Sequence, residues 1–190
     1  MRKLISIVMV LCLLLGAAIA ESAPLMTYDF GDFTMDMPED IQGSIVERAE
    51  NVPFASLYEN YDETAPFNDN VNIVWNSAVE DLSILDPEQT ATAIVQATMA
   101  TYAMSGVEAG NAMLLGAAMT ELDGKPALSF AYSCDIDFSG AGVDYQTTLY
   151  VGQIIVSEEG MGTYTFTQTV EDLEGTPVLD AMLESIAWKN

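Results

Sequence analysis

The residues of this 190-residue chain that could do chemistry are its carboxylates. The sequence has 29 acidic residues, 5 basic residues and no histidine, which excludes Ser-His-Asp and Cys-His catalysis, histidine-ligated zinc and a histidine pH switch. A serine–lysine pair would have to use Lys125, in an expected turn, or Lys189, next to the end of the chain, and neither position suits a buried base. We therefore expect a protein that is not an enzyme and needs no cofactor.

One group of acidic residues has the spacing of a calcium loop. The run Asp135-Ile136-Asp137-Phe138-Ser139-Gly140 copies the first half of an EF-hand loop, and Asp144 follows it. The second half departs from the pattern, because Gln146 stands at position twelve in place of a bidentate acid and no helices flank the loop. A β-hairpin with a polar face explains these aspartates equally well. The metal-site hypothesis is calcium held by Asp135, Asp137 and Asp144.

The first twenty residues have the features of a secretory signal peptide. Arg2 and Lys3 precede an apolar run, Leu4–Leu15, and Ala18-Ile19-Ala20 is a small-x-small cleavage site. This segment is too short and wrongly flanked for a stable membrane span. We expect a secreted protein, cleaved near Ala20, with no integral membrane segment after cleavage.

Removal of residues 1–20 leaves one expected domain, residues 21–190. Its 3 basic and 29 acidic residues give a net charge of −26. Such a charge opposes binding to nucleic acid and to anionic membranes, and it suits a basic partner, divalent cations or simple solubility outside the cell. Cys134 is the one cysteine of this domain, so no internal disulfide forms and the thiol is expected to act as a small buried hydrophobe.

Hydrophobic periodicity predicts an antiparallel sheet. Apolar residues occupy every even position of Ala127–Phe138, which is typical of a strand with one buried face. Strand-like runs at Val143–Val156 and Thr163–Val170 follow through short glycine-bearing turns, so the three form a meander. Further strands are predicted at Met26–Phe30, Phe33–Met37, Phe54–Tyr61, Val71–Trp75 and Gly110–Glu121.

Two helices are predicted to pack on this sheet. Asp86-Pro87 is an N-cap followed by proline, and the helix should continue to about Met104. Thr176-Pro177 is a similar start, and the apolar stripe from Val178 to Ile186 predicts a closing helix. The fold class is therefore α+β, an antiparallel β-sheet flanked by helices. The nine methionines of the mature chain are interpreted as core filler, with an adaptable methionine-rich binding face as the alternative.

Several short motifs resemble those of PsbP-like domains, the Mog-type α-β-α sandwich. They cover most of the mature chain: Tyr28-Asp29-Phe30 through Phe33–Pro38, Asn70-Val71-Asn72-Ile73 with Leu82 and the Pro87 helix, Leu122–Ala127, and Leu183-Glu184-Ser185-Ile186. The resemblance implies a sandwich around an antiparallel sheet, in an exported bacterial branch of a family whose characterised members are binding or assembly factors. It transfers no functional residue, because the matching positions belong to the scaffold.

The preferred functional hypothesis is an exported, non-enzymatic binding or accessory domain, expected to be a monomer, for an unidentified protein partner or small ligand. One alternative is an extracellular hydrolase that uses a pair of carboxylates, one of them buried with a raised pKa. The other alternative is an acidic protein that responds to divalent cations.

Overall fold

The computed structural model describes residues 25–58, 60–173 and 177–189. The predicted signal peptide and Thr176 lie outside the described residues. Within them, seven strands form one antiparallel sheet in the order β3-β4-β5-β9-β8-β7-β6. The bounds are β3 (Gln42–Ile45), β4 (Pro53–Tyr58), β5 (Asn70–Asn76), β6 (Glu108–Leu122), β7 (Lys125–Asp137), β8 (Gln146–Glu158) and β9 (Gly162–Val170).

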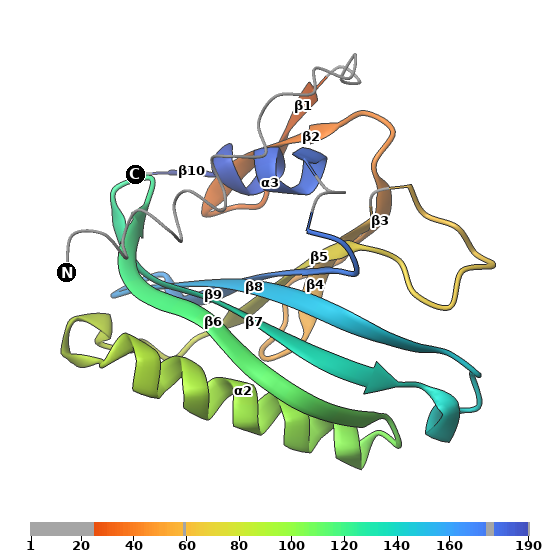
Figure 1. Cartoon of the computed structure of the whole chain (residues 1–190). Helices are drawn as coiled ribbons and strands as arrows, with labels where there is room; N and C mark the ends of the chain where they lie inside the picture. The colour runs from red at the N-terminus through yellow and green to blue at the C-terminus, as the bar shows by residue number, and fades with distance from the viewer. Residues whose placement is uncertain (1–24, 59, 174–176, 190) are drawn as a thin grey trace.

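A small layer covers part of one face of this sheet, and a long helix covers part of the other (Figure 1). The small layer consists of a three-stranded sheet and a helix: β1 (Leu25–Asp29), β2 (Phe33–Pro38), β10 (Ala187–Trp188) and α3 (Pro177–Glu184). The long helix is α2 (Pro87–Met104), which packs against β6 and β7. Two 3-10 turns, Leu82–Ile84 and Ser139–Ala141, complete the described elements. The predicted α+β architecture is confirmed.

Most elements follow the sequence signals, but the strand expected over Val143–Val156 is Gln146–Glu158, one further strand ends early, and the short strands β3 and β10 were not predicted. The helix has the predicted start, since the Asp86 carboxylate accepts the hydrogen bond of the Gln89 amide at 2.9 Å. The strand expected over Phe54–Tyr61 ends at Tyr58, and Tyr61 is exposed instead of facing the core. Strand β3 was not predicted, because its four residues are all exposed and show no alternation, so only pairing with β4 defines it.

The face covered by α2 is lined by the alternating residues of β7. The buried cluster contains Ala91 and Val95 from the helix with Leu128, Phe130, Tyr132, Cys134, Ile136, Leu149 and Val151 from the sheet. Burial raises the pKa of the Cys134 thiol to about 11, so this cysteine is a packing residue at neutral pH.

The small layer is held on the opposite face by Phe33 of β2. Its ring lies 5.5 Å from that of Tyr164, 5.4 Å from Phe166 and 5.2 Å from Trp188, measured between centroids. Phe33 and the two β9 aromatics are fully buried. Edge-to-face aromatic contacts of this kind add to the free energy gained from burying the rings. Trp188 is therefore a packing residue of this contact.

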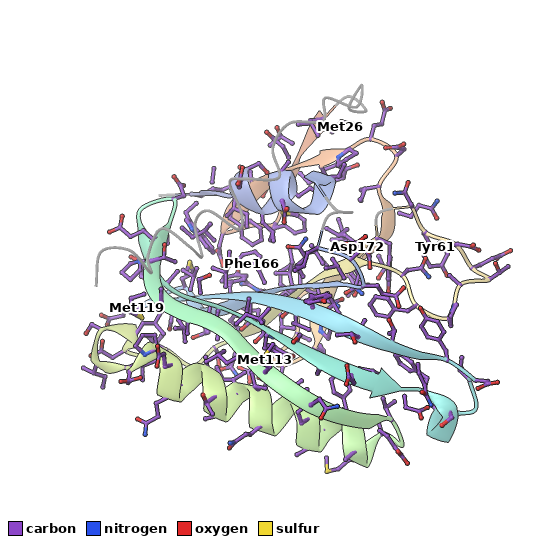
Figure 2. All side chains as sticks on the ribbon, in the orientation of Figure 1. Met26, Tyr61, Met113, Met119, Phe166 and Asp172 are labelled. Carbon is purple, nitrogen blue, oxygen red and sulfur yellow. The ribbon has the colours of Figure 1, made fainter. Side chains whose placement is uncertain are left out.

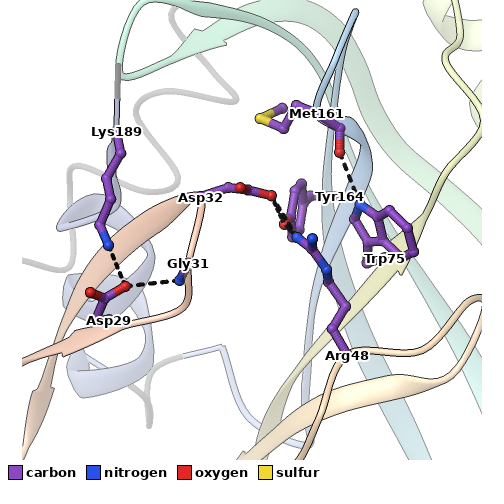
Figure 3. A network of polar contacts seen from close by, with 8 residues as sticks. All are labelled: Asp29, Gly31, Asp32, Arg48, Trp75, Met161, Tyr164 and Lys189. Carbon is purple, nitrogen blue, oxygen red and sulfur yellow. Dashed lines mark hydrogen bonds and ion pairs between the residues drawn. The ribbon is translucent and has the colours of Figure 1, made fainter.

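A polar network at the edge of the same contact joins the small layer to the large sheet (Figure 3). Arg48 Nη1 donates to Asp32 Oδ2 at 2.5 Å and to the hydroxyl of Tyr164, which itself donates to Asp32 Oδ2 at 2.5 Å. The Arg48 guanidinium also lies 4.4 Å from the ring centroid of Trp75. Burial raises the pKa of Asp32, but the hydrogen bonds from Tyr164 and Arg48 outweigh it, and the pKa lies below its ordinary value.

The methionines divide between core and surface. Met35, Met37 and Met182 are buried, as the core-filler interpretation requires. That interpretation is wrong for four others, since Met26, Met104, Met113 and Met119 are exposed. Met113 and Met119 both lie on β6 (Figure 2).

In the part of the chain that the structure describes, neither α2 nor any other helix combines the length and the apolar character that crossing a membrane requires.

Phe33→Ala should lower the free energy of unfolding by about 3–5 kcal/mol, because it empties the centre of the contact between the two layers. Urea unfolding followed by tryptophan fluorescence measures this loss. Leu25→Ala, at an exposed position of β1, is the control and should cost about 0.5 kcal/mol or less. A loss below about 1 kcal/mol for Phe33→Ala would contradict the assigned role of this ring.

Candidate functional site

An acidic hollow lies where β6, β7 and β8 reach their ends near the Ser139–Ala141 turn. Its volume is about 490 Å³, and its lining residues are Glu108, Ala109, Gly110, Asp135, Ile136, Asp137, Gln146, Thr147 and Thr148. Figure 1 shows these strand ends extending beyond the small layer. The small layer therefore does not cover this end of the sheet.

Strand pairing brings the polar side chains of the hollow together. Register places Glu108 opposite Asp137, and Asp135 opposite Thr148. Because side chains alternate along β7, Asp135 and Asp137 share the face that carries Ala127, which is the face opposite α2. Residues that are far apart in sequence thus form one polar surface.

The carboxylate of Asp135 is held by two neutral donors. Asn111 Nδ2 donates to Oδ2 at 2.7 Å, and Thr148 Oγ1 donates to Oδ1 at 2.7 Å. These hydrogen bonds, first from Asn111 and then from Thr148, hold the pKa of Asp135 below its usual value. The side chain is ionised at neutral pH and fixed in orientation.

Asp137 is held in the same way. The Ser139 amide donates to Oδ1 at 2.8 Å, and Gln146 Nε2 donates to Oδ2 at 2.6 Å. Hydrogen bonding to Ser139 is the main cause of its lowered pKa, and Gln146 adds to it. The hollow therefore presents two fixed negative charges beside Glu108.

No cation among the described residues neutralises these charges. The three basic residues in that part of the chain pair elsewhere: Arg48 with Asp32, Lys125 with Glu158 and Lys189 with Asp29. No basic residue lines the hollow. A cationic group from outside the chain is the complement that this surface lacks.

The predicted calcium ligands are partly brought together. Asp135 and Asp137 line the hollow, whereas Asp144 lies exposed in the loop before β8 and does not line it. Among the described residues, no group of three or more Asp, Glu or Cys side chains is placed to hold a metal ion. The calcium site stays a prediction.

Sequence reasoning missed Glu108, Asn111 and Thr148 as parts of this site. Glu108 is 27 positions from Asp135, and no local spacing connects them. Asn111 has a left-handed backbone, φ 50°, within a bulge of β6, and this conformation aims its amide at Asp135. The sequence does predict that a turn at Asp123-Gly124 pairs the Gly110–Glu121 strand with Ala127–Phe138, and this pairing is confirmed. The two bulges that set the register near Glu108 have no such local signal.

A second group of acids lies at the ends of β5 and β9. The amide of Glu171 donates to Asp69 Oδ1 at 2.9 Å, and the Tyr145 hydroxyl donates to Glu171 Oε1. Burial raises the pKa of Asp69, and the neighbouring carboxylates of Glu171 and Asp172 raise it further. This environment, unlike the hollow, favours the protonated form of a carboxyl group.

Comparison with known proteins supports the fold. No protein-family model matches the sequence, and no curated protein matches it. Among solved structures, cyanobacterial PsbP (CyanoP) from Synechocystis sp. PCC 6803 is similar with a TM-score of 0.60 and 13% identity, over 92% of this chain and 96% of that one. The Ran-binding protein Mog1p of Saccharomyces cerevisiae gives a TM-score of 0.49 and 13% identity, over 88% and 96%. The similarity to CyanoP confirms the PsbP-like fold implied by the sequence motifs.

Thr148→Val should raise the pKa of Asp135 toward the ordinary value of about 3.9, because it removes one of the two donors that favour the ionised form. Titration of the carboxyl carbons by NMR measures the change. Asp137, whose donors are untouched, is the internal control and should keep its lowered pKa. An unchanged Asp135 titration would contradict the assigned hydrogen bond.

Proposed function

We propose that this PsbP-like α+β domain is an exported, non-enzymatic binding domain that holds a basic segment of a protein partner in the acidic hollow. The observation that carries the proposal is the pair of fixed, ionised carboxylates, Asp135 and Asp137, in a hollow without a cation. A lysine or arginine side chain of the partner would supply the missing positive charge. The sequence resemblance to a family of binding and assembly factors supports the same class of function.

The acidic hollow suits binding because the carboxylate groups of Asp135 and Asp137, which would accept hydrogen bonds from a ligand, are already ordered. Neutral donors hold both carboxylates in the absence of a ligand, so little side-chain freedom remains to be lost when a cation arrives. The net charge of −24 of the whole sequence would also speed the approach of a basic partner and make the association sensitive to salt. Each exposed ion pair contributes little alone, so several contacts are needed for affinity.

The hydrolase alternative is less well supported by the hollow. A carboxylate pair that cleaves glycosides needs one acid that is still protonated at working pH. The pKa values of Asp135 and Asp137 are both lowered, so neither can donate that proton. The raised pKa of Asp69 meets one requirement at the other acidic group, where Glu171 and Asp172 are neighbouring carboxylates, but none of these three residues lines the hollow.

Binding of a fluorescein-labelled oligolysine, measured by anisotropy at low and physiological salt, tests the proposal. Asp135→Asn with Asp137→Asn should weaken binding about tenfold, because both fixed charges are lost while the amide groups keep the shape of the hollow. The matched control, Asp62→Asn with Glu63→Gln, removes the same charge from an exposed loop and should have a much smaller effect. Equal weakening by the two double variants would mean that the ligand senses only the overall charge, and the proposed site would be wrong.

The calcium alternative makes a different prediction for the same region. If Asp135, Asp137 and Asp144 hold calcium, the ion should raise the melting temperature, because a ligand that binds only the folded state stabilises it. Magnesium at matched ionic strength is the control, and Asp144→Asn should abolish the difference between the two ions. A rise that any salt produces would reflect screening of like charges and would dismiss the metal site.

A further inference from the structure

Strand β6 forms one edge of the seven-stranded sheet. In the described part of the chain it pairs with β7 on one side, and its other side has no strand partner. It is 15 residues long, well above the usual strand length of about 5–6 residues. A long unpaired edge offers backbone donors and acceptors to any extended segment that can lie beside it.

The side chains of β6 are unusually apolar for the surface of so acidic a protein. The strand has no charged residue between Glu108 and Glu121. Met113 is 58% exposed, Leu115 is 39% exposed and Met119 is 38% exposed. Figure 2 places Met113 and Met119 along the strand. Flexible methionine side chains on a surface can adapt to different apolar partners.

Two bulges limit where an added strand can pair. The register with β7 shifts between Gly110 and Met113 and again between Leu114 and Gly116, and it then continues without interruption to Leu122. Bulges bend an edge and prevent indiscriminate pairing along its whole length. The Leu122 carbonyl already accepts the hydrogen bond of the Trp188 indole at 2.9 Å. The regular segment from Gly116 to Glu121 is therefore left for backbone pairing, and the bulged part presents Met113 and Leu115 for side-chain contact.

The charges at the two ends of β6 indicate the kind of partner. Glu108 stands beside the acidic hollow at one end, and Glu121 and Asp123 stand at the other. Antiparallel pairing of two copies about the strand centre would set the Glu108 end of one copy against the Glu121 end of the other, and like charges opposite each other destabilise a strand pair. The large net negative charge of the chain opposes a second copy further.

We infer that the β6 edge, defined by Met113, Leu115 and the segment Gly116–Glu121, binds an extended peptide segment of a protein partner as an additional strand. The segment has an apolar centre and a lysine or arginine toward each end. This inference deepens the proposed function and rests on it only for the basic residue that enters the acidic hollow. Backbone hydrogen bonds supply affinity, while the methionine contacts and the terminal charges supply selectivity.

Selection of a random peptide library displayed on phage, with the purified chain as target, identifies a probe. Enriched peptides should combine alternating apolar residues with basic residues near the ends, and a synthetic copy of the most enriched peptide is then labelled. Met113→Ser with Leu115→Ser should weaken its binding about tenfold or more, because both exposed contacts are lost. Met26→Ser removes a methionine of similar exposure (45%) from the distant small layer and should leave binding unchanged.

Hydrogen exchange measured by NMR distinguishes strand addition from side-chain contact alone. The bound peptide should slow exchange of backbone amides within Gly116–Glu121 and leave those of β3, the opposite edge, unchanged. Absence of enriched peptides, or equal binding to the Met113/Leu115 variant, would overturn the inference. A dimer in sedimentation experiments that the same variant dissociates would assign the edge to a second copy instead.

The two proposals fail in different ways. If the Asp135/Asp137 double variant weakens the binding of oligolysine while the Met113/Leu115 variant leaves the binding of the selected peptide unchanged, the acidic hollow is supported as a binding site and the β6 edge is not. If the Met113/Leu115 variant weakens the binding of the selected peptide while the Asp135/Asp137 double variant leaves the binding of oligolysine unchanged, the β6 edge is supported and the acidic hollow is not.

Discussion

The packing of Phe33 against Tyr164, Phe166 and Trp188 is the contact on which the arrangement of this molecule depends. It joins three distant parts of the chain, because Phe33 belongs to β2, the two ring partners to β9 and Trp188 to the C-terminal β10. Met35, Met37 and Met182 of the small layer are buried in the same cluster, so these rings form the centre of a larger apolar contact with the sheet. The Arg48 network at its edge adds orientation rather than much free energy, since Arg48 and Asp32 are both about one-third exposed.

The position of the small layer decides which part of the sheet remains open. The contact lies over β4, β5 and β9, and the ends of β6, β7 and β8 extend beyond it. On the opposite face, α2 covers the apolar side of β7. The sheet is therefore buried where apolar and polar residues alternate along its strands. It is exposed to solvent where Asp135, Asp137 and Thr148 take the place of apolar residues. The candidate site follows from this incomplete coverage.

The packing of the elements also determines where the positive charges lie. The three cations of the described residues stabilise contacts between elements. Arg48 attaches the small layer to the sheet, Lys189 joins the end of β10 to β1 within that layer, and Lys125 joins the start of β7 to the end of β8. None remains for the acidic hollow, which is satisfied by neutral donors. The part of β6 between Glu108 and Glu121 has no charged residue, so the molecule offers an apolar strip bounded by negative charge. These features together suit a partner with alternating apolar and basic residues.

Local structure was determined by the sequence wherever one short pattern sufficed. The alternation of Ala127–Phe138 and the Asp86-Pro87 cap set a strand and a helix, because period and capping act over a few residues. The Asp123-Gly124 turn was equally readable, with φ values of 47° and 77°. The sequence did not show that the Asp123 carboxylate also accepts the hydrogen bond of the Trp188 amide, 65 positions away. Likewise Ser185, part of a family-like motif, accepts the Asp36 amide across the small layer.

Only the tertiary structure decided the candidate site, the surface methionines and β3. Glu108, Asp135 and Thr148 meet through strand register, which sums many pairings that no single stretch of sequence contains. Met35 and Met113 are the same residue type in similar strand patterns, and their burial differs because the small layer carries one into the core while the sheet edge leaves the other exposed. Composition and periodicity thus determined which elements form and how acidic the surface is. Packing between elements determined which acids stand together and which apolar residues remain outside, because those outcomes depend on contacts between residues far apart in the chain.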